Sequence, residues 1–338
     1  KGETVGYVGG IDLAQQRWDT PAHCCAQSPP CAACEAFKRD PGYSEDTTGW
    51  QDVQVSVRGP VVLDVAGNFV SRWNDDETPS NVNPKESVPA KIAALSADDV
   101  AAAGIGTHTV QLLRTYICSY QKVCKHGCFS NNAPYGETSH RDGLIKAFSK
   151  AQNYIYIEDQ YFVFEKDLHA VLLSAVKRGV HLVILTQDQK GTPGYETYQH
   201  GMIAPLREAC EACVHAFIPS DGVYVHTKVT IVDDMYMTVG SNNINFRSMT
   251  YDTEISVASV DTDLVMSADK ISVGRLALAS RIKMWSAQTK VPVEELMTFT
   301  LEEAISLWYE RAADGSHLVK FDPKEKKAEV TYKSYNES

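Results

Sequence analysis

The chain has 338 residues, of which 43% are hydrophobic and 22% are charged, proportions typical of a globular protein with one large or two ordinary domains. No segment approaches the run of roughly 18 apolar residues that a membrane-spanning helix needs. The net charge of -11 argues against a general nucleic-acid-binding protein, which usually presents a basic surface, although a local basic pocket can lie on an acidic protein.

The first 138 residues alternate between strand-like segments and loops. Residues 5–13 predict a strand that runs into a turn at Gly9 and Gly10. Residues 20–50, rich in Cys, Pro, Ser and Gly, predict an irregular loop. Gly59-Pro60 then opens an amphipathic helix that ends near Trp73. A polar surface insert is expected over 74–104, a strand over 108–119 and a second loop over 120–138.

From residue 139 onwards, helical and strand-like patterns alternate. Helical patterns cover 141–152, 168–177 and 203–213, and strand patterns cover 154–158, 180–186 and further segments up to about residue 257. Such alternation predicts an α/β layout with a sheet between helices. Two amphipathic helices over 268–312 and a charged tail over 313–338 complete the chain.

The nine cysteines fall into three clusters: Cys24, Cys25, Cys31 and Cys34; Cys118, Cys124 and Cys128; and Cys210 with Cys213. Disulfides in an oxidising compartment are one explanation. Zinc is another, since the third and fourth cysteines, and the last two, have ligand spacing. Scattered buried thiols are a third explanation. The odd count leaves at least one cysteine free or paired outside this sequence.

The most informative segment is Val225-His226-Thr227-Lys228, followed at fixed distances by Asp233, Gly240, Ser241 and Asn243. A lone His-x-Lys has little meaning, but the full set has a chance expectation on the order of 10⁻⁵. In a strand, residues two apart share a face, so His226 and Lys228 point together. Ser241 and Asn243, at the end of the next strand of a hairpin, are also two residues apart and so also point to one face. An imidazole, an ammonium, a hydroxyl and an amide on one face suit a phosphodiester.

Alternation along the strand places Asp233 on the face opposite His226. We therefore interpret Asp233 as a structural residue that orders the hairpin and does not contact phosphate. The other nine histidines, His23 among them, lack a comparable set of neighbours and are expected to be surface or core residues.

The motif resembles the H-x-K-x₄-D-x₆-G-S-x-N signature of the phospholipase D superfamily. Further segments, in the right order over about residues 4–312, resemble its eukaryotic phosphatidylcholine-type branch: the stretches Tyr7 to Leu13, Arg17 to Thr20, Gly59-Pro60 with its helix, Tyr156 to Phe162, and Arg247-Ser248-Met249. The two Cys-rich loops are not part of that pattern. Gln51 stands where the branch often has a histidine.

The resemblance implies a bilobal α/β fold with a pseudo-two-fold axis, in which each half is a mixed β-sheet flanked by helices and contributes one motif to a central site. Gly9-Gly10-x-Asp12 and Gly240-Ser241-x-Asn243 are consistent with such a duplication. We expect the remainder of the N-terminal half, with the Cys-rich loops and the polar insert, over 1–138. The C-terminal half with the motif is expected over 139–260, and C-terminal helices with a charged tail over 261–338.

The resemblance also implies roles. One histidine of the family attacks phosphorus to form a phosphohistidine, and the other protonates the leaving alcohol and then activates water. His226 would be this general acid and base, and Lys228, Ser241 and Asn243 would contact the phosphate. No metal or other cofactor is expected, since Lys228 supplies the positive charge. Glu254 matches the carboxylate that holds the histidine's second nitrogen.

Three further residues are candidates for the substrate pocket. Glu158 and Gln160 belong to a strand whose family counterpart borders the site, with an ordinary buried polar network as the alternative. Asp12 corresponds to Asn243 in the other half, with a simple turn role as the alternative.

The expected activity is hydrolysis of phosphatidylcholine at a phospholipid membrane surface to phosphatidic acid and choline, with transfer to another alcohol as a side reaction. The alternatives are a nuclease or other phosphodiesterase of the superfamily, a non-catalytic homologue that binds lipid or a partner, and a one-motif protein that completes its site as a homodimer. Residues 7–13 resemble part of a first motif, which a homodimer would not need, and this argues against the homodimer. No nucleic-acid partner is expected, and the sequence leaves the oligomeric state open. The cysteine clusters favour secretion, with a peripheral cytoplasmic protein as the alternative.

The sequence contains one His-x-Lys, and Gly9-Gly10-Ile11-Asp12 matches the region just downstream of the family's first motif. Because the chain starts with Lys1, we expect the first histidine and lysine to lie upstream of it. The purified 338-residue chain is therefore expected to show little or no choline release from phosphatidylcholine vesicles. Robust hydrolysis by this chain alone would overturn that expectation.

Overall fold

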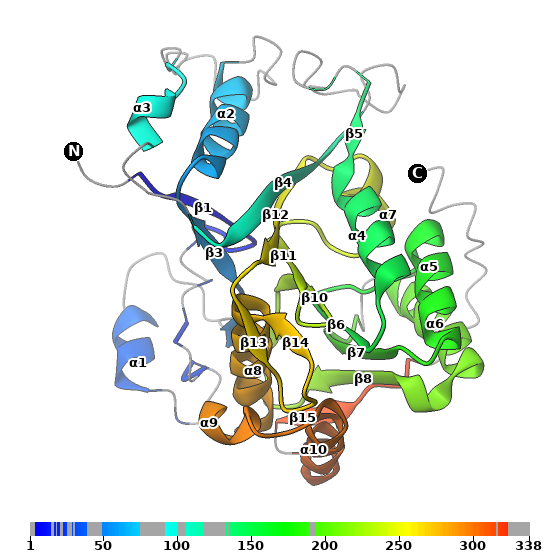
Figure 1. Ribbon diagram of the computed structural model, residues 1–338. Coiled ribbons are helices and arrows are strands. Elements are labelled where there is room, and N and C mark those ends of the chain that lie inside the picture. The colour runs from blue at the N-terminus through cyan, green and yellow to red at the C-terminus, as the bar shows by residue number, and fades with distance from the viewer. Residues whose placement is uncertain are drawn as a thin grey trace.

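The computed structural model describes residues 4–14, 17, 19–20, 23–25, 29, 31–38, 49–74, 92–100, 106–117, 133, 135–189, 194–315 and 317–323. Nine strands form one sheet: β4 (His108–Tyr116), β5 (Glu137–Thr138), β6 (Tyr154–Asp159), β7 (His181–Thr186), β8 (Val214–Pro219), β10 (Lys228–Val232), β11 (Tyr236–Gly240), β12 (Glu254–Asp261) and β15 (Leu318–Lys320). Their order is β15-β8-β7-β6-β10-β11-β12-β4-β5 (Figure 1). The neighbours β6, β7 and β8 run parallel, and the other neighbours run antiparallel. The predicted α/β class is confirmed.

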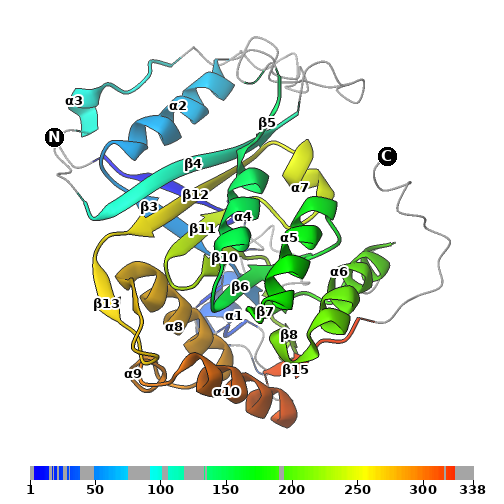
Figure 2. The ribbon, with the colours of Figure 1, turned by 45° about the vertical axis from the view of Figure 1, so that its right-hand side comes forward.

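Strand alternation gives the sheet two apolar faces. Ile155 and Ile157 of β6 belong to one buried cluster, whereas Tyr154 and Tyr156 belong to the other. The first face is covered by α4 (Ser139–Lys150), α5 (Lys166–Lys177) and α6 (Tyr195–Ala209) (Figures 1 and 2). The second is covered by α8 (Arg275–Thr289) and α10 (Leu301–Asp314). Because both faces are buried, β7 is a nearly continuous apolar run and does not alternate with polar residues.

The N-terminal part is smaller and packs beside this sheet. Strands β1 (Gly6–Gly9) and β3 (Gln54–Val57) form an antiparallel pair, followed by α2 (Val61–Trp73) and α3 (Ala97–Val100). Val8, Val57 and Val62 pack with Val257 of β12 in one cluster. A separate short strand, β2 (Trp50–Gln51), runs parallel to β9 (Tyr224–Val225).

The remaining elements are α1 (Ala32–Lys38), α7 (Phe246–Thr250), α9 (Val293–Leu296), a 3-10 turn (Glu211–Cys213) and the hairpin of β13 (Leu264–Met266) and β14 (Ser272–Gly274). In the part of the chain that the structure describes, no helix is both long enough and apolar enough to span a bilayer.

Two strands lie outside the sequence segments to which they were assigned. β4, placed in the N-terminal half, pairs with β12 along its whole length, so the expected boundary at residue 138 runs through one sheet and not between two. β15 lies in the expected charged tail and pairs with β8. Apolar residues such as Leu318 are too few there to give a periodic signal, and the pairing becomes apparent only in the tertiary structure.

The six cysteines among the described residues form disulfides, as one of the three explanations predicts: Cys24–Cys31, Cys25–Cys34 and Cys210–Cys213. The first two bridges join the segment around residue 24 to the start of α1. The third closes the turn after α6. Cys118, Cys124 and Cys128 lie outside the described residues.

The strand register supports the duplication suggested by the two glycine turns. Gly9 of β1 pairs with Gln54 of β3, and Gly240 of β11 pairs with Ser256 of β12. A Cβ on Gly9 would lie 2.7 Å from Cα of Gln54, and a Cβ on Gly240 would lie 1.8 Å from Oγ of Ser256. The partner strand therefore excludes any side chain at both positions, so β1 and β3 correspond to β11 and β12.

Gly240→Ala is expected to lower the free energy of unfolding by about 1–3 kcal/mol, because its Cβ would also meet the carbonyl oxygen of Ile255 at 2.5 Å. Urea unfolding followed by circular dichroism measures the effect. Gly67→Ala in α2 is the matched control, since its Cβ meets nothing within 4 Å and a helical Gly→Ala change should be neutral or stabilising. Equal unfolding midpoints for the two variants would contradict the close approach.

Candidate functional site

His226 lies between two strands and not within one. β9 ends at Val225, β10 begins at Lys228, and the amide of His226 donates to the carbonyl of Gln51 (2.8 Å). The single strand expected for this segment is interrupted because β2 is the parallel partner of β9. The N-terminal part of the chain is thereby brought directly against the histidine.

A carboxylate from the N-terminal part orients the imidazole. Oδ2 of Asp52, which follows β2, lies 2.7 Å from Nδ1 of His226, and the two side chains are only 4% and 16% exposed. A carboxylate at Nδ1 fixes that nitrogen as the donor and leaves Nε2 for proton transfer. The assignment of Glu254 as the partner of His226 is therefore corrected. The partner is 174 residues away in sequence, beyond the reach of motif spacing.

Glu254 is the first residue of β12 and lies beside the end of β11. Its carboxylate accepts hydrogen bonds from the hydroxyls of Ser241 and Ser248, both at 2.6 Å. Burial raises the pKa of Glu254, and these two hydrogen bonds oppose the shift. The carboxylate is thus fixed within the site without being bonded to His226.

The register explains why the two carboxylates differ in partner. Asp52 precedes Gln54 by two residues, as Glu254 precedes Ser256, and the two pairs of strands correspond. Asp52 and Glu254 therefore occupy equivalent positions in the duplicated halves. Asp52, from the N-terminal half, is bonded to His226, from the C-terminal half, so the carboxylate and the imidazole of this pair come from different halves.

The ammonium of Lys228 lies in buried, acidic surroundings. Its side chain is buried, and Nζ donates to the carbonyl of His226. Burial lowers the pKa of Lys228. The carboxylates that oppose this shift are Asp52, Asp159, Glu254 and Asp12. They stabilise the charged form of the amine, which is the form that binds an anion.

The two glycine turns meet at this lysine. A Cβ on Gly10 would lie 3.0 Å from Cδ of Lys228 and 3.4 Å from the carbonyl oxygen of Gly240. The lysine stem therefore packs against backbone from both halves. A Cβ at position 10 would also lie 2.9 Å from Oδ1 of Asp52, so a larger residue there would displace the side chains of Asp52 and Lys228.

Asn243 offers a hydrogen-bond donor that the protein does not use. Its Nδ2 is buried and has no hydrogen-bond partner within the described part of the chain. A buried donor without a partner costs about 1–3 kcal/mol, a cost that a ligand oxygen would remove. Ser241 differs, because its hydroxyl is bonded to Glu254 and its amide donates to Ile255 (2.9 Å). Ser241 therefore fixes the carboxylate and leaves Asn243 free for a ligand.

Asp233 lies at the turn between β10 and β11. Its carboxylate accepts the backbone amides of Gln152, Asn153 and Tyr154, each at 2.8 Å. This set joins the hairpin to the loop before β6. The structure gives Asp233 no contact with His226 or Lys228.

The three further candidates lie around the site and not at its centre. Glu158 is fully buried and accepts hydrogen bonds from Tyr156 and from Nε2 of Gln51 (2.8 Å), and burial raises its pKa. Gln160 donates to the hydroxyl of Tyr224 at 2.5 Å. Asp12 is half exposed and accepts from Arg17 at 3.2 Å.

An aromatic wall beside His226 was not predicted from the sequence. The ring of Trp50 stacks on Tyr224 (4.5 Å between centroids) and lies 5.0 Å from the ring of His226. The guanidinium of Arg17 lies 3.9 Å from the Trp50 ring. The equivalence of β1 and β3 with β11 and β12 identifies Asp52, and with it the neighbouring Trp50, as residues of the site. That equivalence is visible only in the structure.

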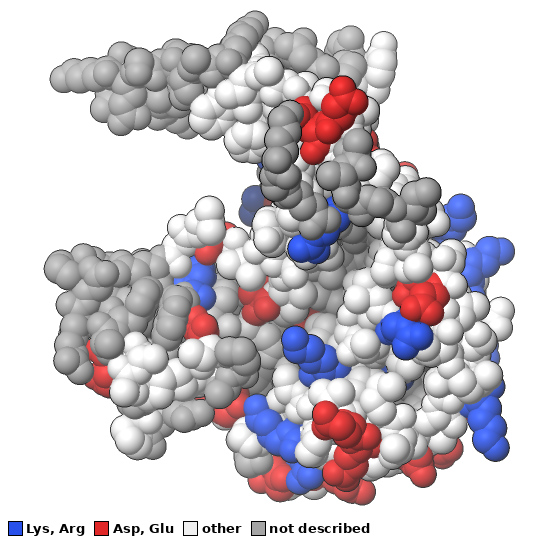
Figure 3. All heavy atoms as spheres, turned by 60° about the vertical axis from the view of Figure 1, so that its left-hand side comes forward, with Lys and Arg blue, Asp and Glu red and all other residues white. Residues whose placement is uncertain are grey.

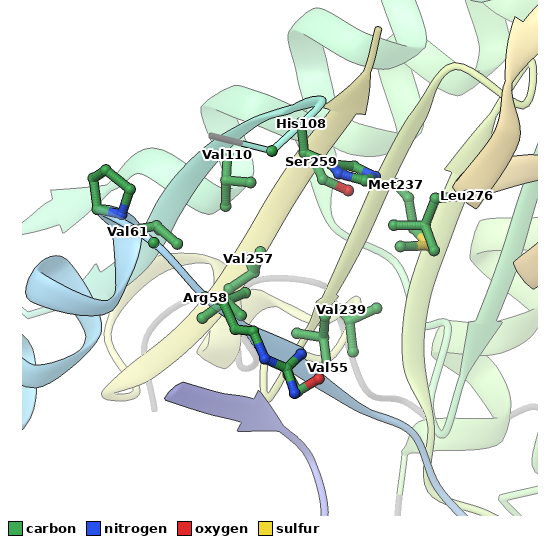
Figure 4. A pocket seen from close by; sticks show the side chains of 15 residues that line it. Val55, Arg58, Val61, His108, Val110, Met237, Val239, Val257, Ser259 and Leu276 are labelled. Carbon is green, nitrogen blue, oxygen red and sulfur yellow. The ribbon is translucent and has the colours of Figure 1, made fainter. Parts of the chain in front are cut away.

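A cavity of about 500 Å³ lies away from these residues. It is lined mainly by aliphatic side chains from β3, β4, β11 and β12, together with Arg58 and His108 (Figure 4). None of the predicted site residues lines it. It is therefore not the place where His226 and Lys228 could act.

Two observations bear on ligands of other kinds. Asp19, Cys24 and Cys25 have ligand atoms within 4.8 Å of one another, but both sulfurs are bonded in disulfides, which prevents them from holding a metal.

Figure 3, with the left-hand side of Figure 1 turned forward, shows a hollowed face on which acidic and basic side chains are interspersed. The described atoms of that face form no continuous basic surface for a polyanion.

Comparison with known families identifies the chain. A family model described as "Phospholipase D" matches residues 1–185 and 219–328, which together make up most of the sequence. The chain belongs to the phospholipase D family. A second model, described as "Cardiolipin synthase, PLD-like domain", matches residues 144–271, the segment that carries the motif.

Curated relatives include plant and yeast phospholipases D. The chain is 26% identical to "Phospholipase D alpha 1" of Carica papaya over 75% of the chain and 42% of that protein. It is 22% identical to "Phospholipase D alpha 3" of Arabidopsis thaliana over 91% and 48%, and 24% identical to "Phospholipase D1" of Schizosaccharomyces pombe over 83% and 26%. The chain thus spans less than half the length of these relatives.

Solved structures that match part of this chain include a phospholipase D family member, Nuc, from Salmonella typhimurium (20% identity, 53% of this chain and 92% of that one, TM-score 0.36). Phosphatidylserine synthase from Haemophilus influenzae is another (16% identity, 65% and 52%, TM-score 0.43).

Asp52→Ala removes the acceptor at Nδ1 of His226. The fraction of neutral imidazole that carries its proton on Nδ1 is expected to fall, as measured by ¹⁵N-edited NMR of the side chain. Glu254→Ala is the matched control, because Glu254 is bonded to Ser241 and Ser248 and should leave the tautomer unchanged. A tautomer shift in the second variant alone would restore Glu254 as the orienting group.

Proposed function

We propose that this chain contributes half of the catalytic site of a phospholipase D that hydrolyses phosphatidylcholine to phosphatidic acid and choline, and that transfers the phosphatidyl group to other alcohols. The observation that carries the proposal is His226 held at Nδ1 by Asp52, beside the buried ammonium of Lys228 and the unused amide of Asn243. These groups fit the reaction of a phosphodiester, whose developing charge requires a cation and donors.

In the proposed mechanism, Nε2 of His226 gives its proton to the leaving choline oxygen while a second histidine attacks phosphorus. The P–O bond breaks and a P–N bond forms. His226, now neutral, takes a proton from water, whose oxygen attacks phosphorus and displaces the second histidine. Lys228 and Asn243 bind the phosphoryl oxygens throughout.

The second histidine is proposed to come from a strand that adds to β1. β11 has β10 on one side and β12 on the other, whereas among the described residues β1 has β3 alone. A strand equivalent to β10, antiparallel to β1, would place a His-x-Lys across from Gly9. Glu254, equivalent to Asp52, would then hold that histidine as Asp52 holds His226.

Several finer assignments belong to this proposal. The substrate is a phospholipid at a membrane surface, Asp12, Glu158 and Gln160 shape the pocket wall, and Asp233 supports the hairpin. Secretion is supported by the disulfides of the described residues, since such bridges persist in oxidising compartments. The net charge of -11 favours a lipid over a nucleic-acid substrate.

In a polypeptide that joins this chain to a segment with a second His-x-Lys, His226→Ala is expected to lower choline release from phosphatidylcholine vesicles by at least about 10²-fold, because proton transfer to the leaving group is lost. His317→Ala is the control: its side chain pairs with Asp221 at 3.4 Å and is 40% exposed, and the rate should be unchanged. Cleavage of single-stranded DNA without choline release would favour the nuclease alternative. Vesicle binding without product would favour a non-catalytic homologue.

A further inference from the structure

The cavity that lies away from the candidate site has a floor of side chains from one face of the sheet. The register places Met237 of β11 opposite Ser259 of β12, and Ser259 opposite Val110 of β4. Val239 and Val257 form the next row, and since residues two apart in a strand share a face, they lie on the same side. All five residues line the cavity of about 500 Å³ (Figure 4). That volume lies within the range of roughly 300–1,000 Å³ that small-molecule sites occupy.

A second wall of the cavity comes from the N-terminal part of the chain. Val55 and Val57 of β3 and Val61 of α2 line it. β3 begins two residues after Asp52, and β11, which contributes to the floor, ends directly before Ser241. An occupant of the cavity would therefore contact two strands whose ends carry residues of the candidate site.

Apolar and basic residues of the lining differ in exposure. Met237, Val239 and Val257 are each at most 6% exposed. Arg58 and His108, the two basic residues of the lining, are exposed to solvent. An amphiphile would therefore bury its apolar tail on the sheet face and keep its polar head hydrated beside a basic side chain. Mostly apolar pockets with a few polar groups that fix orientation are typical of small-molecule sites.

The charge of the lining indicates the sign of the head group. Among the described residues, no aspartate or glutamate lines the cavity, although the chain has 43 acidic residues and 32 basic ones. Nε2 of His108 lies 3.5 Å from Oδ2 of the buried Asp261, so a protonated His108 already has a counter-ion. Arg58 is therefore the cation to which we assign an anionic head. A guanidinium binds a carboxylate through two parallel hydrogen bonds.

We infer that this cavity binds a fatty acid anion, with the carboxylate at Arg58 and the hydrocarbon chain along the sheet face over Met237, Val239 and Val257. The inference goes beyond the proposed function and does not depend on it, because no residue of the site around His226 lines the cavity. Failure of one therefore leaves the other untouched.

The direct test is isothermal titration calorimetry of the chain with octanoate, decanoate and dodecanoate, each below the concentration at which it forms micelles. Binding to a single site is expected to tighten by about fourfold for each methylene that the lining buries. Dodecyltrimethylammonium, which has the same tail and a cationic head, is expected to bind at least about tenfold more weakly than dodecanoate. No binding, or an affinity that does not depend on chain length, would overturn the inference. Equal affinity for the cationic amphiphile would refute the assignment of an anion.

Substitutions locate the site within the molecule. Val110→Phe narrows the cavity and is expected to weaken dodecanoate binding by about fifteenfold, the effect of displacing two methylenes from the lining. Thr109→Phe is the matched control, because it places the same ring on the other face of β4, where the residue is exposed. The thermal midpoint of each variant shows whether it is folded.

Arg58→Gln tests the head group on an exposed residue and so remains informative if Val110→Phe does not fold. Dodecanoate binding is expected to weaken by about tenfold, the value of one hydrogen bond to a charged group, whereas the affinity for dodecanol should not change. Arg72→Gln is the control, since Arg72 lies in the last turn of α2 and does not line the cavity. A folded Arg58→Gln or Val110→Phe variant that binds dodecanoate as tightly as the unsubstituted chain would overturn the inference.

Discussion

The site depends on one hydrogen bond between residues that are far apart in sequence. Asp52 follows a two-residue strand, β2, and His226 follows a two-residue strand, β9, and the parallel pairing of these strands brings carboxylate and imidazole to 2.7 Å. Neither strand has enough length to be stable alone. Their pairing is supported by the stacked rings of Trp50 and Tyr224 and by the bonds from Gln51. The orientation of Nε2 is therefore a property of the assembled fold.

Charge balance is the second constraint. A buried lysine without neighbouring carboxylates would lose its proton, and buried carboxylates without a cation would gain one. Burial raises the pKa of Asp159 and of Glu254 and lowers that of Lys228, and the charge of the lysine and those of the two carboxylates oppose these shifts. Binding of an anionic phosphate to such a centre is favoured because the cation is already desolvated, and Asn243 adds a donor that has no other partner.

The sequence predicted the local part of this site and missed the distant part. His226, Lys228, Ser241 and Asn243 are linked by one hairpin, so their spacing alone places them together. The helix after Gly59-Pro60 and the α/β layout were likewise predicted from periodicity. Asp52 and Trp50 could not be, because only the β2–β9 pairing brings them near the histidine. Glu254 was predicted to hold His226, whereas its carboxylate is bonded to Ser241 and Ser248, because spacing fixes its place on β12 but not its partners. The addition of β4 to the C-terminal sheet was missed for the same reason.

The two disulfides near His23 join cysteines that are only 7 and 9 positions apart in the sequence. A ring that short restricts few conformations of the unfolded chain, so each bridge contributes only about 2–3 kcal/mol by chain entropy. Their main effect is to hold Cys24 and Cys25 against Cys31 and Cys34 at the start of α1. None of the nine strands of the large sheet contains a bridged cysteine. A thiol reductant would therefore separate these two segments without breaking a strand pairing of that sheet.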